Sequence, residues 1–299
     1  MKNIIIVGAS SGIGNRVARD FARMGWRVGV AARREAPLKE LQKEFPDSVV
    51  YRTIDVTLPD SVERFNNLIE ALGGMDVLLY ATGTGFQNPT LDIEREVVTL
   101  ETNVVGMARI TLAAYRYFRD TANRDRGQIA VITSIAGTKG IGVAAAYSAS
   151  KRFQNTYIEA LEQLARRQRV NIDFTDIRPG FIRTALLNEA VDYPMIMTLD
   201  YVAPLIELAI LRRQRVATLD WRWRLVTAAW RLIPRCLWVR MPVDALCGEP
   251  KKEEEPIVVE EQSSMETVVE NAARGIVNND QPADASDADA RKYLDNQPK

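Results

Sequence analysis

The feature that most constrains this sequence is an alternation of short apolar runs with longer amphipathic patterns along most of the chain. Continuous runs of β-branched residues are typical of strands that are buried on both faces of a sheet. Strands that alternate with helices over short connections predict an α/β fold, a doubly wound parallel sheet with flanking helices. The predicted strands are residues 4–7, 26–32, 49–54, 76–80, 128–133 and 171–177.

A glycine-rich turn follows the first predicted strand and opens a helical pattern. Glycines let the backbone approach a ligand closely, and the first turn of a helix offers free N–H groups to a pyrophosphate. The spacing is G-x-x-x-G-x-G rather than G-x-G-x-x-G, and glycines also serve ordinary turns. We expect the turn to bind a dinucleotide through Gly8, Ser10, Ser11, Gly12, Ile13 and Gly14.

Two arginines end the second predicted strand, about 20 residues past the glycines, where dinucleotide-binding folds contact the adenosine ribose. Arg33 and Arg34 suit a 2′-phosphate through charge-assisted hydrogen bonds, which favours NADP(H) over NAD(H). The alternative is a solvated arginine pair at the start of a helix, and Glu35 is the nearest acid.

Tyr147 and Lys151 are four residues apart, which places them one turn apart on the same face of a helix. A nearby positive charge lowers the pKa of a phenol, which can then act as a general acid or base. Ser134 follows the fifth predicted strand, and strand ends in a parallel sheet border the ligand crevice. By itself, however, the Tyr–Lys spacing is also common on ordinary helix surfaces.

In combination, these motifs resemble the short-chain dehydrogenase/reductase family over residues 1–219. Besides the glycine turn, the matching motifs in order are Asp55, Asn103-Val104-Val105-Gly106, Ser134, Tyr147-x-x-x-Lys151, Pro179-Gly180 and Thr184. The resemblance implies a Rossmann-type fold and hydride transfer between a nicotinamide cofactor and a carbonyl or alcohol.

The resemblance also implies residue roles. Tyr147 would exchange the substrate proton, and Lys151 would hold the nicotinamide ribose and lower the pKa of the tyrosine. Ser134 would bind the carbonyl oxygen, and Asn103 would keep a water in the proton relay. Further cofactor contacts are implied for Asp55, Val56, Ala81, Thr82, Gly83, Asn103, Tyr147, Lys151, Pro179, Gly180, Ile182 and Thr184.

The chain contains no histidine, which excludes Ser-His and Cys-His nucleophiles and imidazole metal sites, and we expect no metal. Only Cys236 and Cys247 are present, which favours a reducing, cytoplasmic location. The first apolar run is too short for a signal peptide, and we expect no membrane-spanning helix.

Residues 181–201 should form a lid over the substrate in this fold, and they are strongly apolar. Their composition predicts a hydrophobic small-molecule carbonyl substrate. Packing of the lid on the core is an equally good explanation. The apolar members are Leu186, Leu187, Tyr193, Pro194, Met195, Ile196, Met197 and Leu199.

Residues 211–240 contain eight arginines and four tryptophans, with Asp220 as the only acid. On one helix, Arg224, Arg231 and Arg235 would share a side, and Pro234 would kink or end the helix. The opposite side would carry Trp221, Leu225, Ala229, Leu232, Cys236 and Val239.

A basic amphipathic helix of this kind predicts a peripheral contact of residues 221–240 with an anionic membrane, at its inner face. Packing on the core or an oligomer contact is the alternative, because Arg and Trp are also enriched at protein interfaces. We expect a homo-oligomer and no nucleic acid, whose stacking platforms usually lie on sheets or loops.

The predicted domain organisation is a Rossmann domain over residues 1–219, a basic Trp/Arg-rich segment over 220–248 and an acidic tail over 249–299. The tail has 13 acidic and 6 basic residues and almost no aromatic ones, a composition typical of disorder.

The function predicted from the sequence is an NADP(H)-dependent oxidoreductase that interconverts a carbonyl and an alcohol. The alternative is a catalytically silent, membrane-associated nucleotide-binding protein. A sugar-nucleotide epimerase would share Tyr-x-x-x-Lys, but it would need a larger substrate domain after the sixth strand.

Overall fold

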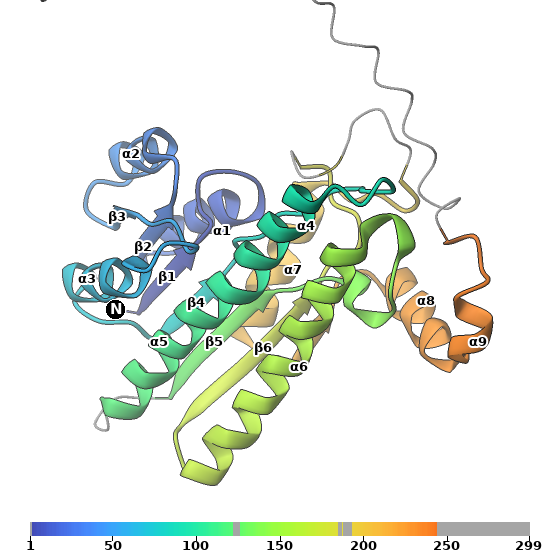
Figure 1. The fold of residues 1–299 in the computed structure, drawn as a ribbon. Coiled ribbons are helices and arrows are strands. Elements are labelled where there is room, and N and C mark those ends of the chain that lie inside the picture. Colours follow the sequence, from blue (N-terminus) through green and yellow to red (C-terminus); the bar gives the residue numbers. More distant parts are fainter. Residues whose placement is uncertain (1, 122–125, 185–186, 188–192, 244–299) are drawn as a thin grey trace, which may run out of the picture. The chain divides into compact units, whose positions relative to one another are not determined.

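The computed structural model describes residues 2–121, 126–184, 187 and 193–243. Within these residues, seven strands form one parallel sheet in the order β3-β2-β1-β4-β5-β6-β7 (Figure 1). The winding reverses between β1 and β4, which is the switch point where doubly wound sheets bind ligands. The predicted α/β sheet is confirmed, and β7 extends it beyond the six predicted strands.

The elements follow one another with short connections. In chain order they are β1 (Asn3–Val7), α1 (Gly12–Arg23), β2 (Arg27–Ala32), α2 (Glu35–Glu44), β3 (Val49–Thr53), α3 (Ser61–Leu72), β4 (Val77–Tyr80), α4 (Ile93–Leu100), the π-helical turn η1 (Glu101–Gly106), α5 (Met107–Asp120), β5 (Gly127–Ile132), the 3-10 turns η2 (Ile135–Thr138) and η3 (Gly142–Ala144), α6 (Ala145–Gln168), β6 (Ile172–Arg178), α7 (Leu199–Leu211), β7 (Val216–Thr218), α8 (Trp221–Leu232) and α9 (Arg235–Trp238).

The sheet is buried on both faces, each covered by its own apolar layer. Side chains alternate along β1, so Ile4 and Ile6 pack with α1, α2 and α7, whereas Ile5 and Val7 pack with α3, α5 and α6. All four side chains are completely buried. This explains why the strands have continuous apolar runs rather than alternating polar and apolar residues.

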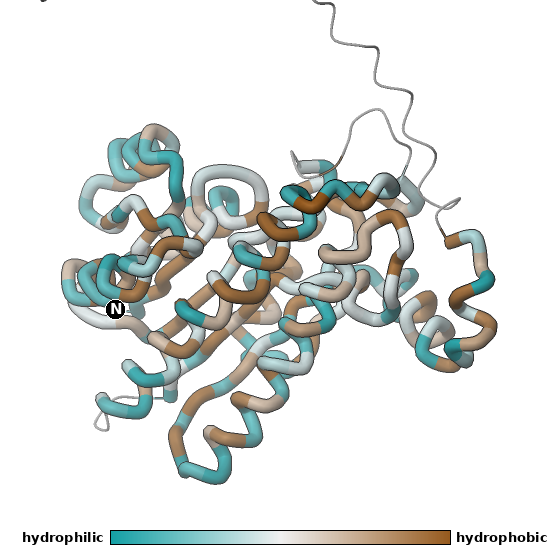
Figure 2. Tube along the Cα trace, in the orientation of Figure 1, coloured by the Kyte–Doolittle hydropathy of each residue, from teal (hydrophilic) through white to brown (hydrophobic). Residues whose placement is uncertain are grey.

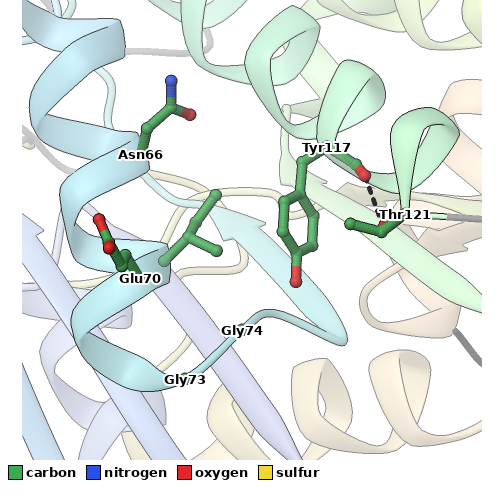
Figure 3. Close-up of a pocket in the computed structure, with 7 residues that line it drawn as sticks. Asn66, Glu70, Gly73, Gly74, Tyr117 and Thr121 are labelled. Carbon is green, nitrogen blue, oxygen red and sulfur yellow. Dashed lines mark hydrogen bonds between the residues drawn. The ribbon is translucent and has the colours of Figure 1, made fainter.

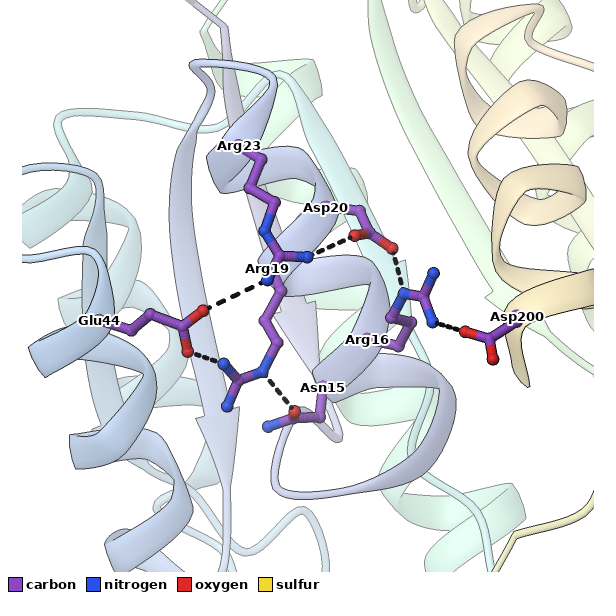
Figure 4. A network of polar contacts seen from close by, with 7 residues as sticks. All are labelled: Asn15, Arg16, Arg19, Asp20, Arg23, Glu44 and Asp200. Carbon is purple, nitrogen blue, oxygen red and sulfur yellow. Dashed lines mark hydrogen bonds and ion pairs between the residues drawn. The ribbon is translucent and has the colours of Figure 1, made fainter. Parts of the chain in front are cut away.

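A charged network on α1 links the helices on one face of the sheet (Figure 4). Arg16 contacts Asp200 on α7, while Arg19 and Arg23 both contact Glu44 on α2. These groups are partly exposed, and exposed ion pairs contribute little net stability. The network therefore orients the three helices more than it stabilises them.

The helical stretch from Ile93 to Asp120 is continuous but not uniform. The turn η1 interrupts α-helical geometry between α4 and α5, and such π-helical turns often mark functional sites. By length and composition alone this stretch is apolar enough to cross a membrane, which the sequence analysis did not anticipate. Half of its most apolar window is buried, and Met107 and Ile110 pack against the sheet as in a core helix.

The basic segment breaks at Pro234, where the sequence predicted a kink or an end of the helix. Helix α8 ends at Leu232, and Pro234 lies before the short helix α9 because proline cannot continue a helix. The prediction that residues on both sides of the proline share one helix face is therefore wrong. Trp223 and Trp238 are buried, so part of the segment packs on the core as the alternative proposed.

Residues up to 243 all belong to one compact unit of the chain, and α8 is part of it. The predicted boundary at residue 219 follows β7 directly. The acidic tail, residues 249–299, lies outside the described residues.

A buried polar cluster joins β5, α6 and β6 beneath the carboxyl edge of the sheet. Asp176 accepts hydrogen bonds from Thr133 Oγ1 at 2.5 Å, from Asn155 Nδ2 at 3.0 Å and from Arg178 Nε at 2.8 Å. Asn155 also donates to Thr133 Oγ1 at 3.0 Å. A buried carboxylate needs such partners, so the cluster determines where α6 lies on the sheet.

Asn155→Ala should lower the free energy of unfolding by about 1–3 kcal/mol, because it removes donors from a buried carboxylate. Urea unfolding at neutral pH measures the change. Asn67→Ala, at an exposed position of α3, is the matched control and should shift stability by less than about 0.5 kcal/mol. Equal midpoints for the two variants would contradict a supporting role of the cluster.

Candidate active site

The glycine-rich turn lies against the loop that follows β4. A Cβ on Gly8 would lie 2.6 Å from the Thr82 amide nitrogen, and a Cβ on Gly14 would lie 2.3 Å from the Gly8 carbonyl oxygen. Gly8 also has a φ of +102°, which side-chain-bearing residues rarely adopt. These close approaches hold the amino end of α1 at the switch point, where helix N–H groups can bind a phosphate.

The loop after β6 also lies against the glycine-rich turn. Thr184 Cγ2 lies 3.6 Å from the position of a Cβ on Gly12, and Ile135 N donates to the Pro179 carbonyl at 3.0 Å. Ile182 forms a parallel bridge with Met197, which closes the base of the predicted lid. Lid residues 185–186 and 188–192 lie outside the described residues.

The end of β2 brings an arginine to the glycine turn. Arg34 donates through Nη2 to Ser11 Oγ at 2.9 Å and to Ser10 Oγ at 3.2 Å, whereas Arg33 is simply exposed. Glu35 faces Lys39 and accepts from the Tyr51 hydroxyl at 3.1 Å. The lysine holds the pKa of Glu35 below its usual value. The nearest acid is thus already engaged within the protein.

Tyr147 and Ser134 meet at the end of β5. Ser134 is buried, and its hydroxyl accepts from Ala136 N at 3.1 Å and hydrogen-bonds the Tyr147 side chain. A Cβ on Gly85 would lie 2.2 Å from Tyr147 Cδ2, so the backbone of the loop after β4 packs closely against the phenol ring. The half-buried phenol is held between these two loops.

Lys151 lies one turn further along α6 and is almost completely buried, with 4% of its surface exposed. Its Nζ donates to the Ile132 carbonyl at 3.2 Å and to Gln154 Oε1 at 3.1 Å. The ammonium also lies 5.7 Å from the centroid of the Tyr147 ring. The predicted pairing of phenol and ammonium along one helical turn is therefore present.

Asn103 lies in the π-helical turn η1 and is fully buried. Its side chain accepts from Thr84 N at 2.9 Å and donates to Thr84 O at 2.7 Å and to Ser150 Oγ at 2.9 Å. Its backbone carbonyl accepts from Gln154 Nε2 at 2.9 Å. Asn103 thus joins η1 to α6 and to the loop after β4, rather than only holding a water.

Gln154 is one of two site residues that were not predicted from the sequence. Its amide bridges the Lys151 ammonium and the Asn103 carbonyl, and the side chain is completely buried. A buried amide three residues past Lys151 lies next to the lysine on a helix, and this spacing was the available signal. Gly85 was also missed, because its contact with Tyr147 depends on tertiary packing.

Burial shifts the pKa values of both titratable groups of the pair toward their neutral forms. It raises the pKa of the Tyr147 phenol, while the hydrogen bond from Ser134 acts in the opposite direction. It lowers the pKa of Lys151 to about 8, although the negative charge of Asp176 opposes this shift. Desolvation thus dominates, and the expected lowering of the tyrosine pKa by the lysine is not the main effect.

The remaining predicted cofactor contacts lie around the same crevice. Asp55 accepts from Thr57 N at 2.9 Å at the end of β3, and Val56 packs beneath Gly106. A Cβ on Gly83 would lie 3.3 Å from Lys151 Nζ. The other members lie in the glycine-rich turn and the start of α1, in the loop after β4 and in the loop after β6: Gly8, Gly12, Ile13, Gly14, Ala81, Thr82, Pro179, Gly180, Ile182 and Thr184.

The residues present suit a dinucleotide. The glycine turn leaves no room for a Cβ at Gly8 or Gly14, and the described contacts include no side-chain cap from Ser11 onto α1. Lys151 has three N–H donors, of which two donate to protein groups in the described structure. The remaining donor suits a ribose hydroxyl.

A pocket of about 410 Å³ lies elsewhere, between α3 and the end of α5 (Figure 3). It is lined by Asn66, Ile69, Glu70, Gly73, Gly74, Tyr117 and Thr121. These residues lie near the amino ends of the strands, at the edge of the sheet opposite to the glycine turn. Of the polar residues that line it, only Glu70 is charged, so this pocket has no set of groups suited to proton transfer.

Comparisons with known proteins identify the family that has this arrangement of residues. Residues 2–193 match the family model of the short chain dehydrogenases. The chain is 32% identical over 244 residues to an uncharacterized oxidoreductase of Myxococcus xanthus, covering 79% of this chain and 94% of that protein. It is 33% identical over 189 residues to a putative ketoacyl reductase of Streptomyces coelicolor, covering 61% and 71%.

Solved structures show the same fold. An actinorhodin polyketide ketoreductase variant with NADPH superposes with a TM-score of 0.62 at 25% identity, covering 73% of this chain and 95% of that one. A short-chain dehydrogenase from Sphingobium yanoikuyae with NADPH gives 0.65 at 22% identity, covering 81% and 96%. The second likeness concerns the fold alone.

The family model covers more than half of the chain, and the Tyr, Lys, Ser and Asn side chains converge beside the glycine turn. This protein therefore belongs to the short-chain dehydrogenase/reductase family of oxidoreductases, which bind a nicotinamide cofactor.

Proposed function

We propose that this protein is an NADP(H)-dependent oxidoreductase that interconverts a carbonyl and an alcohol on an apolar small molecule. The observation that carries the proposal is the Ser134–Tyr147–Lys151 constellation, in which a phenol contacts a hydroxyl and lies 5.7 Å from a buried ammonium. These groups surround the crevice beside the glycine turn, where family members bind the cofactor.

The side chains suit proton transfer to a substrate oxygen. Tyr147 stays protonated at neutral pH because burial raises its pKa, so its O–H can donate to a developing alkoxide. Ser134 provides a second hydroxyl that hydrogen-bonds the same oxygen. A bound nicotinamide would supply or accept the hydride, and the protein would provide orientation and charge.

The preference for NADP(H) rests on the basic end of β2. Arg34 is hydrogen-bonded to Ser10 and Ser11 of the glycine turn. At this place its guanidinium would meet the 2′-phosphate of a bound NADP(H). The acid that could instead bind a ribose hydroxyl, Glu35, is paired with Lys39. NADPH in the ketoreductase structure that resembles this chain also supports the proposal.

The apolar character of the substrate is inferred from the base of the lid. The Phe181 ring is tilted against that of Tyr193, with centroids 4.8 Å apart, and meets Trp223 edge-on at 5.6 Å. Ile196 and Phe86 are exposed. The silent nucleotide-binding alternative receives no support from the relatives, which are described as oxidoreductases and reductases.

The first prediction from this proposal tests the reaction itself. Tyr147→Phe should lower kcat for NADPH-dependent ketone reduction at least about 1000-fold, because it removes the proton donor. NADPH binding, followed by fluorescence, should change less than about threefold. The assay uses ketones from small and polar to long-chain and apolar, with the wild type as reference. Full turnover in the variant would reject the role of Tyr147.

The second prediction tests cofactor choice. Arg34→Ala should raise the KM for NADPH by about 10-fold or more, because a charged hydrogen bond to the 2′-phosphate is lost. The KM for NADH should stay within about twofold. Arg23→Ala, an exposed arginine at the far end of α1, is the control. If both cofactors respond equally to Arg34→Ala, the NADP(H) preference is wrong.

The third prediction concerns Gln154 as a positioning residue for the ammonium. If reduction requires charged Lys151, kcat/KM should fall above the lysine pKa of about 8. Gln154→Glu places a carboxylate beside the ammonium, raises its pKa and should move this alkaline limb to higher pH. Gln154→Leu removes the acceptor and should move the limb to lower pH. If both variants lose activity but the alkaline limb of kcat/KM does not shift in opposite directions, Gln154 has a purely structural role.

A further inference from the structure

The α8 helix has two apolar faces, of which only one is covered. Trp223 and Thr227 are buried, and Val226 and Trp230 pack against the core. The opposite face carries a second apolar row, spaced i, i+4, i+7 and i+11, which places it along one line of the helix. This outer stripe consists of Trp221, Leu225, Ala228 and Leu232.

The outer stripe is strongly exposed in the described structure. The exposed fractions are 66% for Trp221, 62% for Leu225 and 83% for Leu232. Leu237 on helix α9, and Val239 and Met241 after it, are also exposed. Single exposed apolar residues are ordinary, but a contiguous exposed patch marks an interaction surface.

Arginines border the outer stripe. Arg224 and Arg231 follow Trp221 by three and ten positions and therefore lie along one side of the stripe. Arg235 and Arg240 are exposed on and beside α9. Figure 2 shows hydrophobic and hydrophilic residues interspersed along these two helices.

The positive charge of this surface is balanced by few acids within its own segment of the described chain. Asp220 is the only acid between residues 211 and 243. It is buried and paired with Arg222, Oδ2 to Nη2 at 2.6 Å, and this contact lowers the pKa of its carboxyl. The remaining arginines of α8 and α9 therefore give the surface a net positive field.

From this arrangement we propose that the outer stripe and its arginines form a docking surface for an anionic membrane. The apolar row enters the interface between headgroups and acyl chains, and the flanking guanidiniums contact lipid phosphates. An apolar row with a basic border is better matched to a membrane interface than to a purely polar partner.

A second copy of the chain fits this surface less well. A two-fold contact pairs a patch with itself, so it would bring the arginines that border the stripe in one copy toward those of the other copy. Like charges across an interface oppose association, whereas an anionic bilayer neutralises them. The observations thus favour the membrane over self-association.

The docking surface is attached to the loops that border the substrate side of the site. Lys139 Nζ donates to the Ile233 carbonyl at 2.8 Å, and Trp238 Nε1 donates to the Gly140 carbonyl at 2.7 Å. Trp223 packs directly on Gly180, since a Cβ there would lie 2.2 Å from Trp223 Nε1. A membrane-bound α8 therefore places these loops near the lipid surface.

The test is flotation of the full-length protein with phosphatidylcholine vesicles that contain or lack phosphatidylglycerol, at low and high salt. The wild type should float with anionic vesicles at low salt and bind about 10-fold or more weakly to neutral ones. No flotation with anionic vesicles, or equal binding to neutral ones, overturns the proposal. The assay is independent of catalysis, so its outcome is separate from that of the proposed function.

Two variants identify the surface. Trp221→Ser/Leu225→Ser/Leu232→Ser should weaken binding by about 100-fold, and Arg224→Gln/Arg231→Gln by about 30-fold. Leu91→Ser/Ile93→Ser and Arg166→Gln/Arg167→Gln are matched controls at exposed positions of other elements and should bind as the wild type does. Circular dichroism checks that every variant is folded.

Other outcomes would also decide the question. If the outer-stripe variant binds vesicles as well as the wild type, the surface is not the membrane contact. If light scattering shows that the outer stripe instead mediates self-association without lipid, and vesicles do not compete, the partner is a second copy and the proposal is overturned.

Discussion

The buried ammonium of Lys151 is the constraint on which the rest of the site depends. A cation that is 96% removed from solvent must be held by acceptors, and here the Ile132 carbonyl and Gln154 supply them. The two acceptors connect the lysine to different parts of the fold. Ile132 ends β5, and Gln154, on α6, contacts η1. Because Lys151 needs both, α6, β5 and the π-helical turn must come together before the lysine can be buried.

The same polar contacts explain the local geometry of the catalytic groups. Asn103 is placed by the π-helical turn, and it ties that turn to the loop after β4 and to Ser150 on α6. Gly85 in that loop supports the ring of Tyr147. Asp176 holds Thr133, next to Ser134, against α6 through Asn155. The proposed proton donor and its neighbours are thus positioned by a connected set of buried hydrogen bonds, not by the Tyr–Lys spacing alone.

Much of the fold and most of the site could be predicted from the sequence. The continuous apolar runs around Ile5 and Ile129 indicate strands that are buried on both faces. The glycines that follow the first strand indicate a close approach of the backbone to a ligand. Gln154 escaped notice because an amide in a helix has no distinctive pattern until its two partners are known. A kink or end of the helix at Pro234 was predicted, but the residues after the proline were still placed on the helix faces of the residues before it, whereas the chain starts a new helix there. Residues 249–299 and the predicted disorder of the acidic tail lie outside the described residues.

By itself the sequence determined the parallel sheet, the glycine turn at its first strand and the one-turn separation of phenol and ammonium, because these depend on local periodicity and spacing. Only the tertiary structure decided which groups neutralise the buried lysine and which tryptophans pack inward, because burial depends on contacts between residues far apart in the chain. It also decided the dominant influence on the pKa values of Tyr147 and Lys151, because removal from solvent outweighs the hydrogen bond of Ser134 in the one case and the charge of Asp176 in the other.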